Sequence, residues 1–396
     1  MTAAIDRVLL ESVRNGKVPG VVGLVATDSG IRYRGAYGVR SVGGSDPMEL
    51  DSVFRIASMT KAITATAAMQ LVEAGRIALE QPIGEILPFA GDVQVLEGFD
   101  DAGEPRLRAP AQPVTLRHLL THTSGYGYDI FNPDLGRYVQ MKGLPSIVTC
   151  QHDSLKVPLL FDPGTQWEYG IGIDLVGRIV ETVSGQDLEA YFQQHIFAPL
   201  GMTSSSFRPN ASMRERMVGT HARGPNGKAV PIEFEFPQDA EFLMGGGGLY
   251  ATGPDYLAFC RMLLAGGSLG GQQVLRPETV KLMSENHIGA IDVPLLKSSN
   301  PQMALEVEFF PGIVKKWGLS FLINTGDVPN GRAAGSLAWA GVHNTFFWID
   351  PVSQLTAVLM MQLLPANDPG VLETLLAFEK VVYSVYPNIT YSASAR

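Results

Sequence analysis

A serine and a lysine three positions apart are the residues of this chain best suited to nucleophilic chemistry. They are Ser58 and Lys61, and the residues around them predict a helix over 59–73. Residues three apart on a helix share one face. A serine hydroxyl is a weak nucleophile until a base removes its proton, and a neighbouring amine can do so once desolvation lowers its pKa. The spacing therefore favours an acyl-serine enzyme.

The start of that helix offers a second chemical feature. Free N–H groups and positive potential at a helix N-terminus suit a developing oxyanion. The alternative is that Ser58 only caps the helix and Lys61 is a solvated surface residue, because Ser-x-x-Lys often occurs by chance. The apolar lead-in to Ser58 and further motifs downstream favour catalysis.

Several segments together resemble a known family. The Ser-x-x-Lys helix resembles that of class C β-lactamases, D-alanyl-D-alanine peptidases and family VIII carboxylesterases. Four further segments resemble the same proteins in the same order: LRHLLTHTSG at 116–125, FDPGTQWEY at 161–169, FAPLGM at 197–202 and GGGL at 246–249. The resemblance covers residues 20 to 360. It implies an α+β fold of the β-lactamase/transpeptidase type.

The resemblance assigns roles to two tyrosines. Tyr169 stands where these enzymes carry a catalytic tyrosine, which would work with Lys61 to accept the serine proton or relay it to a leaving group. The asparagine that β-lactamases and peptidases place two residues later is replaced here by Ile171, which argues against β-lactam substrates. Tyr128 falls where the esterases place a further tyrosine facing the nucleophile, and Tyr126 is the alternative.

A third motif, Lys-Thr-Gly or His-Thr-Gly in the relatives, corresponds to Trp339-Ala340-Gly341 and is most similar to that of the esterases. A neutral indole at Trp339 replaces a cation that would bind a substrate carboxylate, so uncharged esters are expected. Gly341 is expected to let its strand approach the acyl group. The N–H of Val342 would then join that of Ser58 as an oxyanion donor.

Two other patterns could suggest different chemistry. Ser268 lies in a Gly-x-Ser-x-Gly sequence, but a nucleophile elbow needs a strand before it, and a helix is predicted there instead. His118 and His122 are four apart, yet no third zinc ligand accompanies them. These histidines are expected to be structural, and neither a metal nor an organic cofactor is implied.

The predicted elements bracket a helical middle with strands at both ends of the chain. Strands are predicted over 20–27, 31–40, 316–322, 333–340, 345–349 and 355–361, and helices over 3–15, 116–120, 173–183, 188–197, 254–265 and 370–385. This order predicts one antiparallel sheet flanked by terminal helices. We expect an α/β domain from residues 1–60 and 241–396, a mainly helical domain from 61–240, and the active site between them.

Composition narrows the functional classes. With 396 residues, 45% of them hydrophobic and 17% charged, the chain can bury one large core or two fused ones. A net charge of −9 and the lack of a Lys/Arg run argue against nucleic-acid binding. The sequence contains no run of about 18 apolar residues, so no membrane span is predicted. A cytoplasmic location is expected. Cys150 and Cys260 are expected to be free buried thiols.

These features predict a serine carboxylesterase that hydrolyses short-chain neutral esters through an acyl-serine intermediate, with a small-molecule ester as its partner. A β-lactamase or D-alanyl-D-alanine peptidase would share the nucleophile. An acyltransferase of the same fold would share the whole site. A non-catalytic binding protein is least favoured, because Ser58, Lys61 and Tyr169 are all present.

Overall fold

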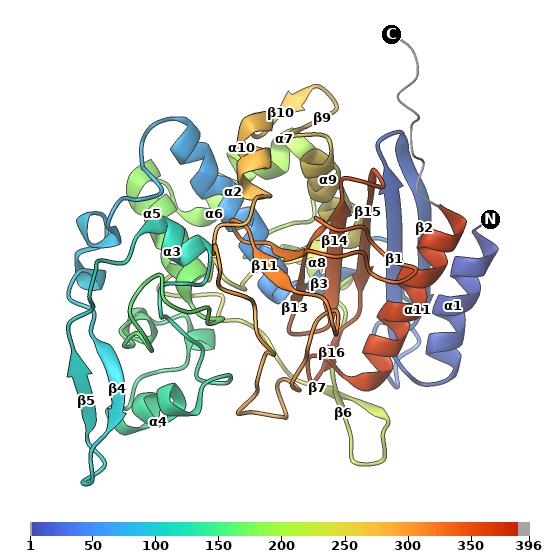
Figure 1. Cartoon of the computed structure of the whole chain (residues 1–396). Helices are drawn as coiled ribbons and strands as arrows, with labels where there is room; N and C mark the ends of the chain where they lie inside the picture. Colours follow the sequence, from blue (N-terminus) through green and yellow to red (C-terminus); the bar gives the residue numbers. More distant parts are fainter. Residues whose placement is uncertain (1, 387–396) are drawn as a thin grey trace.

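A seven-stranded antiparallel sheet forms the frame of the protein, as a computed structural model that describes residues 2–386 shows (Figure 1). In spatial order its strands are β11 (Lys315–Trp317), β12 (Leu322–Asn324), β13 (Leu337–Gly341), β14 (Thr345–Asp350), β15 (Leu355–Met360), β1 (Gly20–Thr27) and β2 (Gly30–Gly38). The hairpin of β1 and β2 pairs with β15, so the two ends of the chain share one sheet. The predicted fold class is confirmed.

Two predicted strands differ from the observed ones. The apolar run at 316–322 forms β11 and β12 rather than one strand, because residues 318–321 make a tight turn in which Ser320 has a φ of 77°. The strand predicted at 333–340 begins only at Leu337. In its first part the N–H of Ala333 is bonded to the Asp350 carboxylate instead of a neighbouring strand.

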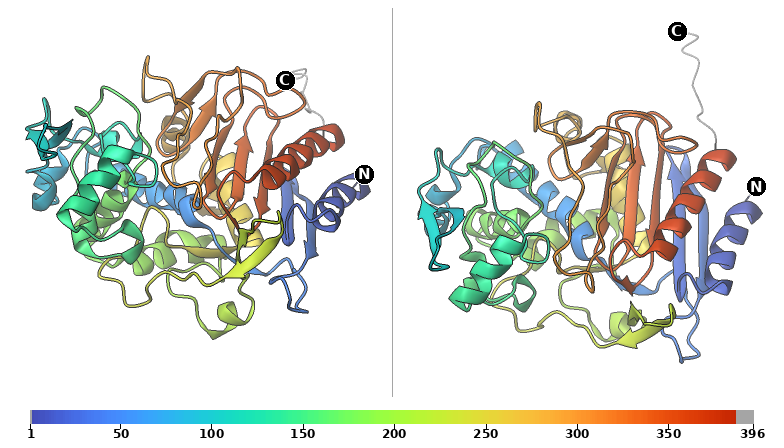
Figure 2. Two further views of the ribbon diagram at one scale, coloured as in Figure 1. Left: turned by 90° about the horizontal axis from the view of Figure 1, so that it is seen from below. Right: turned by 60° about the horizontal axis from the view of Figure 1, so that its bottom comes forward.

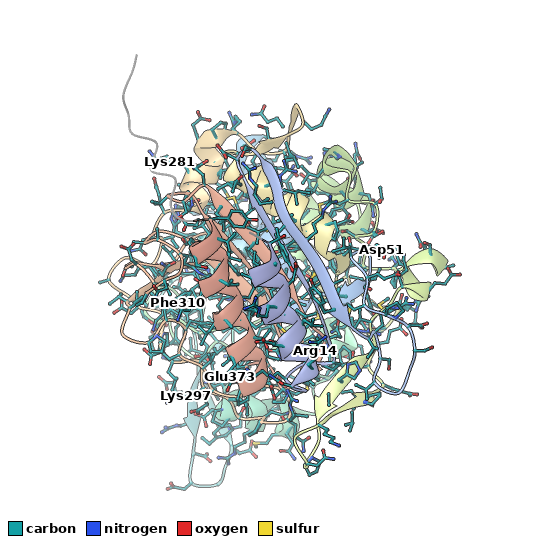
Figure 3. All side chains as sticks on the ribbon, turned by 90° about the vertical axis from the view of Figure 1, so that its right-hand side faces the viewer. Arg14, Asp51, Lys281, Lys297, Phe310 and Glu373 are labelled. Atoms are coloured by element: carbon teal, nitrogen blue, oxygen red, sulfur yellow. The ribbon has the colours of Figure 1, made fainter. Side chains whose placement is uncertain are left out.

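Helices cover both faces of the sheet. The terminal helices α1 (Ala3–Arg14) and α11 (Pro369–Val385) lie side by side on one face (Figure 3), and α9 (Gly253–Leu264) packs on the other. Every residue of β1 is buried, as expected for a strand covered on both faces. A Cβ on Gly23 would lie 2.8 Å from Leu9 Cδ1, so this glycine lets α1 approach the sheet closely.

The remaining helices lie mainly beside the sheet (Figures 1 and 2). They are α2 (Thr60–Glu73), α3 (Leu116–Leu120), α4 (Pro133–Lys142), α5 (Gly172–Ser184), α6 (Leu188–Phe192), α7 (Ala198–Leu200), α8 (Ala211–Glu215) and α10 (Pro277–Met283). Helix α2 is buried along most of its length and packs against α5. The domain boundaries expected from the sequence remain a prediction.

Small strand pairs complete the fold. They are β3 (Val53–Arg55) with β8 (Tyr250–Thr252), β4 (Val95–Phe99) with β5 (Pro105–Arg108), β9 (Ser268–Leu269) with β10 (Gln272–Gln273), and β6 (Thr220–Arg223) between β7 (Ala229–Ile232) and β16 (Leu363–Leu364). Cys150 and Cys260 are buried free thiols.

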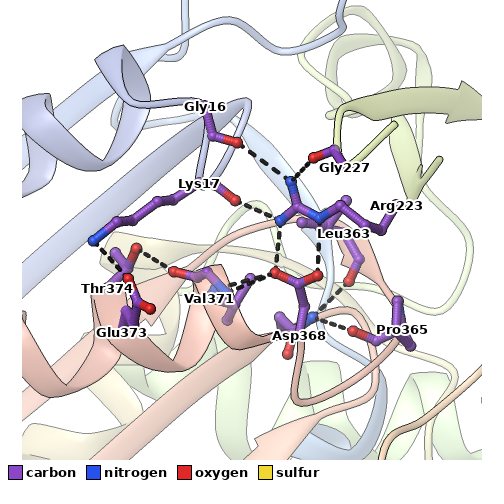
Figure 4. A network of polar contacts seen from close by, with 12 residues as sticks. Gly16, Lys17, Arg223, Gly227, Leu363, Pro365, Asp368, Val371, Glu373 and Thr374 are labelled. Carbon is purple, nitrogen blue, oxygen red and sulfur yellow. Dashed lines mark hydrogen bonds and ion pairs between the residues drawn. The ribbon is translucent and has the colours of Figure 1, made fainter. Parts of the chain in front are cut away.

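An ion pair fastens the β6–β7 hairpin to the terminal helices. Arg223 binds both carboxylate oxygens of Asp368 at 2.6 and 2.9 Å and donates to the carbonyl of Lys17 (Figure 4). Asp368 also accepts the N–H groups of Gly370 and Val371, which caps the start of α11. The hairpin that leads into one wall of the cavity described below is therefore anchored to the sheet region.

Candidate active site

Ser58 and Lys61 lie at the junction between a short 3₁₀ turn, η1 (Ala57–Met59), and α2. Ala57 has a φ of 45°, a strained conformation for a residue with a side chain. This turn leaves Ser58 partly exposed on the wall of a cavity, while Lys61 is only 1% exposed. The predicted pair is therefore brought together, and the lysine is desolvated rather than on the surface.

The Lys61 amine contacts three oxygen atoms. Nζ lies 3.1 Å from Ser58 Oγ, 3.0 Å from Tyr128 Oη and 2.6 Å from the carbonyl oxygen of Gly246. Tyr128 rather than Tyr126 is thus the tyrosine at the lysine. Burial, followed by the nearby Asp174, raises the pKa of Tyr128 well above its usual value, so its hydroxyl stays protonated.

Tyr169 lies over the lysine but is not bonded directly to the serine. Nζ of Lys61 is 4.8 Å from the centre of the Tyr169 ring. The indole Nε1–H of Trp339 donates a hydrogen bond of 3.1 Å to Tyr169 Oη. Within the described residues, no hydrogen bond joins Tyr169 to Ser58. No motif in the sequence pointed to this hydrogen bond from Trp339 to Tyr169.

His122 belongs to the aromatic support of Tyr169. Its ring packs edge-on against Tyr169 at 5.0 Å and also contacts Trp167 and Trp317. Burial, together with the charge of Lys61, holds the pKa of His122 well below its usual value, so the imidazole is neutral. His118 is used differently, because its Nδ1 accepts the N–H of Thr115 at the start of α3.

The predicted oxyanion donors both lie on the cavity. The N–H groups of Ser58 and Val342 make no hydrogen bond within residues 2–386, and both residues line the cavity. Gly341 brings the end of β13 against the turn that carries Ser58, since a Cβ there would lie 2.3 Å from the carbonyl oxygen of Ile56. Thr345 Oγ1 donates to the same carbonyl. Two free N–H groups beside a nucleophile can hold a carbonyl oxygen.

The cavity in front of Ser58 has a volume of about 350 Å³ and is mostly apolar. Residues from both the helical part and the sheet part line it, among them Ile130, Phe131, Phe234, Phe236, Met303 and Phe309. Trp339 forms part of the same wall, as expected from the third motif. No motif marks the first six of these residues in the sequence, because they lie in connecting segments.

Asp174 and Gly246 are two further residues near the site without a predicted role. Asp174 is fully buried on α5, and its Oδ1 accepts the N–H of Gly246 at 2.8 Å. Burial raises the pKa of Asp174 to about 6. Nothing in the sequence of α5 singled out Asp174, because its connection to Lys61 runs through Gly246, which is distant in the chain.

Ser268 lies away from the cavity. It is on β9, in a two-residue pairing with β10, and is not among the residues that line the cavity.

Among residues 2–386, no helix combines the length and the apolar character needed to cross a membrane.

Comparison with known proteins gives consistent matches over nearly the whole chain. Residues 5–381 match the β-lactamase family. The chain is 34% identical to monacolin J acid methylbutanoyltransferase from Aspergillus terreus, over 97% of both chains, and 31% identical to lovastatin esterase from Penicillium rubens, over 96% and 98%. The unliganded selenomethionyl structure of simvastatin synthase from A. terreus superposes with a TM-score of 0.86 at 31% identity, over 98% of both chains. The chain therefore belongs to the β-lactamase family.

Proposed function

We propose that the chain is a serine acyl-transferring enzyme that takes an acyl group from a neutral ester onto Ser58. The observation that carries the proposal is the buried amine of Lys61, 3.1 Å from Ser58 Oγ at the wall of an apolar cavity. A nucleophile within hydrogen-bonding distance of a desolvated base is the arrangement that activates a serine.

Acylation uses the contacts of Lys61. A neutral amine donates its two N–H groups to Tyr128 Oη and the Gly246 carbonyl, which leaves its lone pair for the Ser58 hydroxyl. The proton moves from Oγ to Nζ as the Oγ–carbon bond forms. The former carbonyl oxygen gains the negative charge and is held by the N–H groups of Ser58 and Val342.

Tyr169 supplies the proton for the leaving alcohol. Its Oη accepts from Trp339, so the tyrosine's own O–H is free to donate toward the cavity, and the Trp339 N–H stabilises the phenolate left behind. In the second step, water or another alcohol gives its proton to this phenolate and attacks the acyl group. Ser58 Oγ recovers its proton from Lys61, which closes the cycle.

The walls of the cavity favour uncharged, apolar substrates. Trp339 occupies the place of a cation, and Asp129, whose pKa burial raises, is the carboxylate at the wall. Neutral short-chain acyl esters of the kind that family VIII carboxylesterases hydrolyse fit these walls. Cephalosporins and D-alanyl-D-alanine peptides, which carry a carboxylate, find no lysine in the third motif.

Transfer to an alcohol is a second candidate. The volume of about 350 Å³ lies in the range of pockets that enclose drug-sized ligands and exceeds what a short acyl group requires. The relatives include a methylbutanoyltransferase and a lovastatin esterase. A bulky alcohol bound in the cavity would accept the acyl group in place of water.

The experiment that tests the proposal measures the intact mass of the protein after brief mixing with p-nitrophenyl butyrate. We expect one butyryl group on the peptide that contains Ser58. Ser58→Ala should remove both the adduct and the hydrolysis, whereas Ser268→Ala should retain both. Full activity in Ser58→Ala would exclude this nucleophile.

Substrate choice and acyl fate are measured on the same preparation. Short neutral esters should give a higher kcat/KM than any cephalosporin, and the reverse order would show that the chain acts as a β-lactamase rather than as an esterase. Lovastatin hydrolysis, and methylbutanoyl transfer from a p-nitrophenyl ester to monacolin J acid, then compare water with a bulky alcohol as acceptor. Formation of the transfer product at the expense of free acid would favour the second candidate.

A further inference from the structure

The buried carboxylate of Asp174 is a charged group beside the nucleophile that the steps above do not use. It is 0% exposed, and its Oδ1 accepts the Gly246 N–H at 2.8 Å. Oδ2 has no hydrogen-bond partner at normal geometry, although the Tyr128 hydroxyl lies close enough to favour the charged carboxylate. No Lys or Arg forms an ion pair with Asp174 in the part of the chain that the structure describes. Burying a carboxylate in this way opposes folding, which raises the question of what it does.

Two residues connect Asp174 to the Lys61 amine. Gly246 gives its N–H to Asp174, while its carbonyl oxygen accepts from Lys61 Nζ at 2.6 Å. A Cβ on Gly246 would lie 2.5 Å from Asp174 Oδ2, so a glycine is needed for this close approach. Tyr128 accepts from Lys61, and its hydroxyl also interacts with Asp174.

Among the titratable groups around Asp174, Lys61 is the one whose positive charge the carboxylate can stabilise. The titratable groups facing Asp174 are Lys61 from α2, Tyr128 from the segment after α3, and Cys150 from the turn after residues 147–149. Tyr128 stays protonated, and burial, followed by the charge of Asp174, raises the pKa of the Cys150 thiol to about 12. Burial raises the pKa of Asp174 to about 6, with Lys61 opposing the shift, so the carboxylate is anionic at neutral pH.

We propose that Asp174 is a positioning residue that stabilises the Lys61 ammonium formed when Ser58 gives up its proton. The inference rests on the proposed function. As the Oγ–carbon bond forms and the proton reaches Nζ, a positive charge appears in a desolvated site. A fixed anion, connected to the amine through the two hydrogen bonds of Gly246, stabilises that charge without any reorganisation. Asp174 takes no proton itself, and its Gly246 contact keeps the lysine's carbonyl acceptor in place.

The test replaces the charge while keeping the shape. Asp174→Asn retains an oxygen that can accept the Gly246 N–H. We expect kcat for p-nitrophenyl butyrate to fall by about 10²-fold, the range found when one stabilising group is removed from a charged transition state, with little change in KM. The rise of rate with pH should shift to lower pH, because the amine loses its proton more readily without the anion. The Tm should stay the same or increase, since a buried charge is gone.

Asp255→Asn is the matched control. Asp255 is also a buried carboxylate whose pKa burial raises, but it contacts Ser204 and Ser205 and does not line the cavity. The control should keep the parent kcat and pH profile.

The possible outcomes can be told apart. If Asp174→Asn keeps the parent kcat and pH profile, the inference about Asp174 is overturned. The proposed function still stands in that case, provided that the parent is acylated at Ser58. A lower kcat with an unshifted pH profile and a lower Tm also overturns the inference, because that is the pattern of a structural residue. If Asp174→Asn does not fold, the smaller and equally uncharged Asp174→Ser is judged by the same two measurements. If the parent protein is never acylated at Ser58, the proposed function itself is contradicted.

Discussion

At the scale of single residues, the proposed mechanism depends on how Lys61 and Tyr169 divide the proton transfers of one reaction. Lys61 contacts the serine directly, whereas Tyr169 lies over the lysine and is bonded to Trp339. The proposed mechanism accordingly gives the serine proton to the lysine and the leaving-group proton to the tyrosine. In this proposal the two residues act in one cycle rather than as two independent bases.

The first prediction follows from this division. Lys61→Ala and Tyr169→Phe should each lower kcat/KM by at least ~10²-fold, which is typical of general acid–base catalysis. The double variant should be little slower than the poorer single variant, because residues that work as a unit are not additive. Steady-state kinetics on p-nitrophenyl butyrate give all three values. Multiplicative losses would show that the two residues act independently.

The second prediction concerns the hydrogen bond from Trp339 to Tyr169. Trp339→Phe keeps a ring in the wall but removes the N–H. We expect kcat to fall by roughly 10-fold, because a hydrogen bond to a charged group contributes about 1.5–3 kcal/mol. Trp348→Phe is a matched control, because Trp348 makes the same kind of bond to Tyr383 in the core under α11. Equal losses of activity in both variants would assign the effect to stability.

At the scale of elements, the proposed oxyanion hole depends on the contact between β13 and the turn η1. One proposed donor comes from each of them, namely Val342 just after β13 and Ser58 in η1. Gly341 and the hydroxyl of Thr345 both meet the Ile56 carbonyl, which fixes the two elements against each other. The oxyanion site is thus a property of how two distant segments dock.

The third prediction tests that docking. Gly341→Ala would place a Cβ 2.3 Å from the Ile56 oxygen and 2.4 Å from Thr345 Oγ1, so the strand must shift. We expect a loss of about 10²-fold in kcat/KM from misplacement of the donor, with a destabilisation of about 1–3 kcal/mol from overpacking. Gly326→Ala, whose Cβ would meet only Ile313 at 3.5 Å, should change neither. Kinetics and urea unfolding measure both quantities, and parent-like kinetics in Gly341→Ala would contradict the proposed oxyanion hole.

At the scale of the whole molecule, the cavity is a product of both ends of the chain. The sheet strands supply Trp339 and the residues after it, the middle of the chain supplies Tyr128 and Tyr169, and the segment after β7 supplies Phe234. Bringing these together buries polar groups as well as apolar ones. His343 is one of them, since both ring nitrogens are buried without a hydrogen-bond partner in residues 2–386.

The fourth prediction is a pH dependence of stability. Burial, with a further contribution from Arg55, lowers the pKa of His343 from 6.5 to about 3. In the unfolded chain the imidazole binds a proton as pH falls below its usual pKa, while in the folded protein it does not. The folded protein is therefore destabilised relative to the unfolded chain as pH falls below 6.5, the ordinary pKa of the imidazole. From pH 7 to pH 5 the parent should lose about 2 kcal/mol relative to His343→Gln.

Urea unfolding of both proteins at pH 7 and pH 5 measures this difference. The comparison between variants removes the effects of the other buried groups, several of which titrate in the opposite direction, such as Asp174. A constant difference between the two proteins across this range would show that His343 is not desolvated in the fold.

The sequence by itself determined most of the elements and the pairing of Ser58 with Lys61. Alternating and apolar runs marked β1, β14 and β15, and spacing along one helix placed Ser58 beside Lys61, because these are local properties of the chain. It erred at residues 316–322, where an apolar run conceals a turn that tertiary packing against Met283 imposes on Gly318. Local patterns cannot encode such a contact.

Only the tertiary structure decided which tyrosine faces the lysine, that Trp339 donates to Tyr169, and that a carboxylate on α5 lies behind the site. Each of these depends on atoms more than 60 positions apart in the chain being within hydrogen-bonding distance, as the separations of 67, 170 and 72 residues show. No helical or strand periodicity reaches that far. Desolvation and hydrogen bonding act through space, so the buried, hydrogen-bonded environment of Lys61 exists only once the sheet and the helices have packed around it.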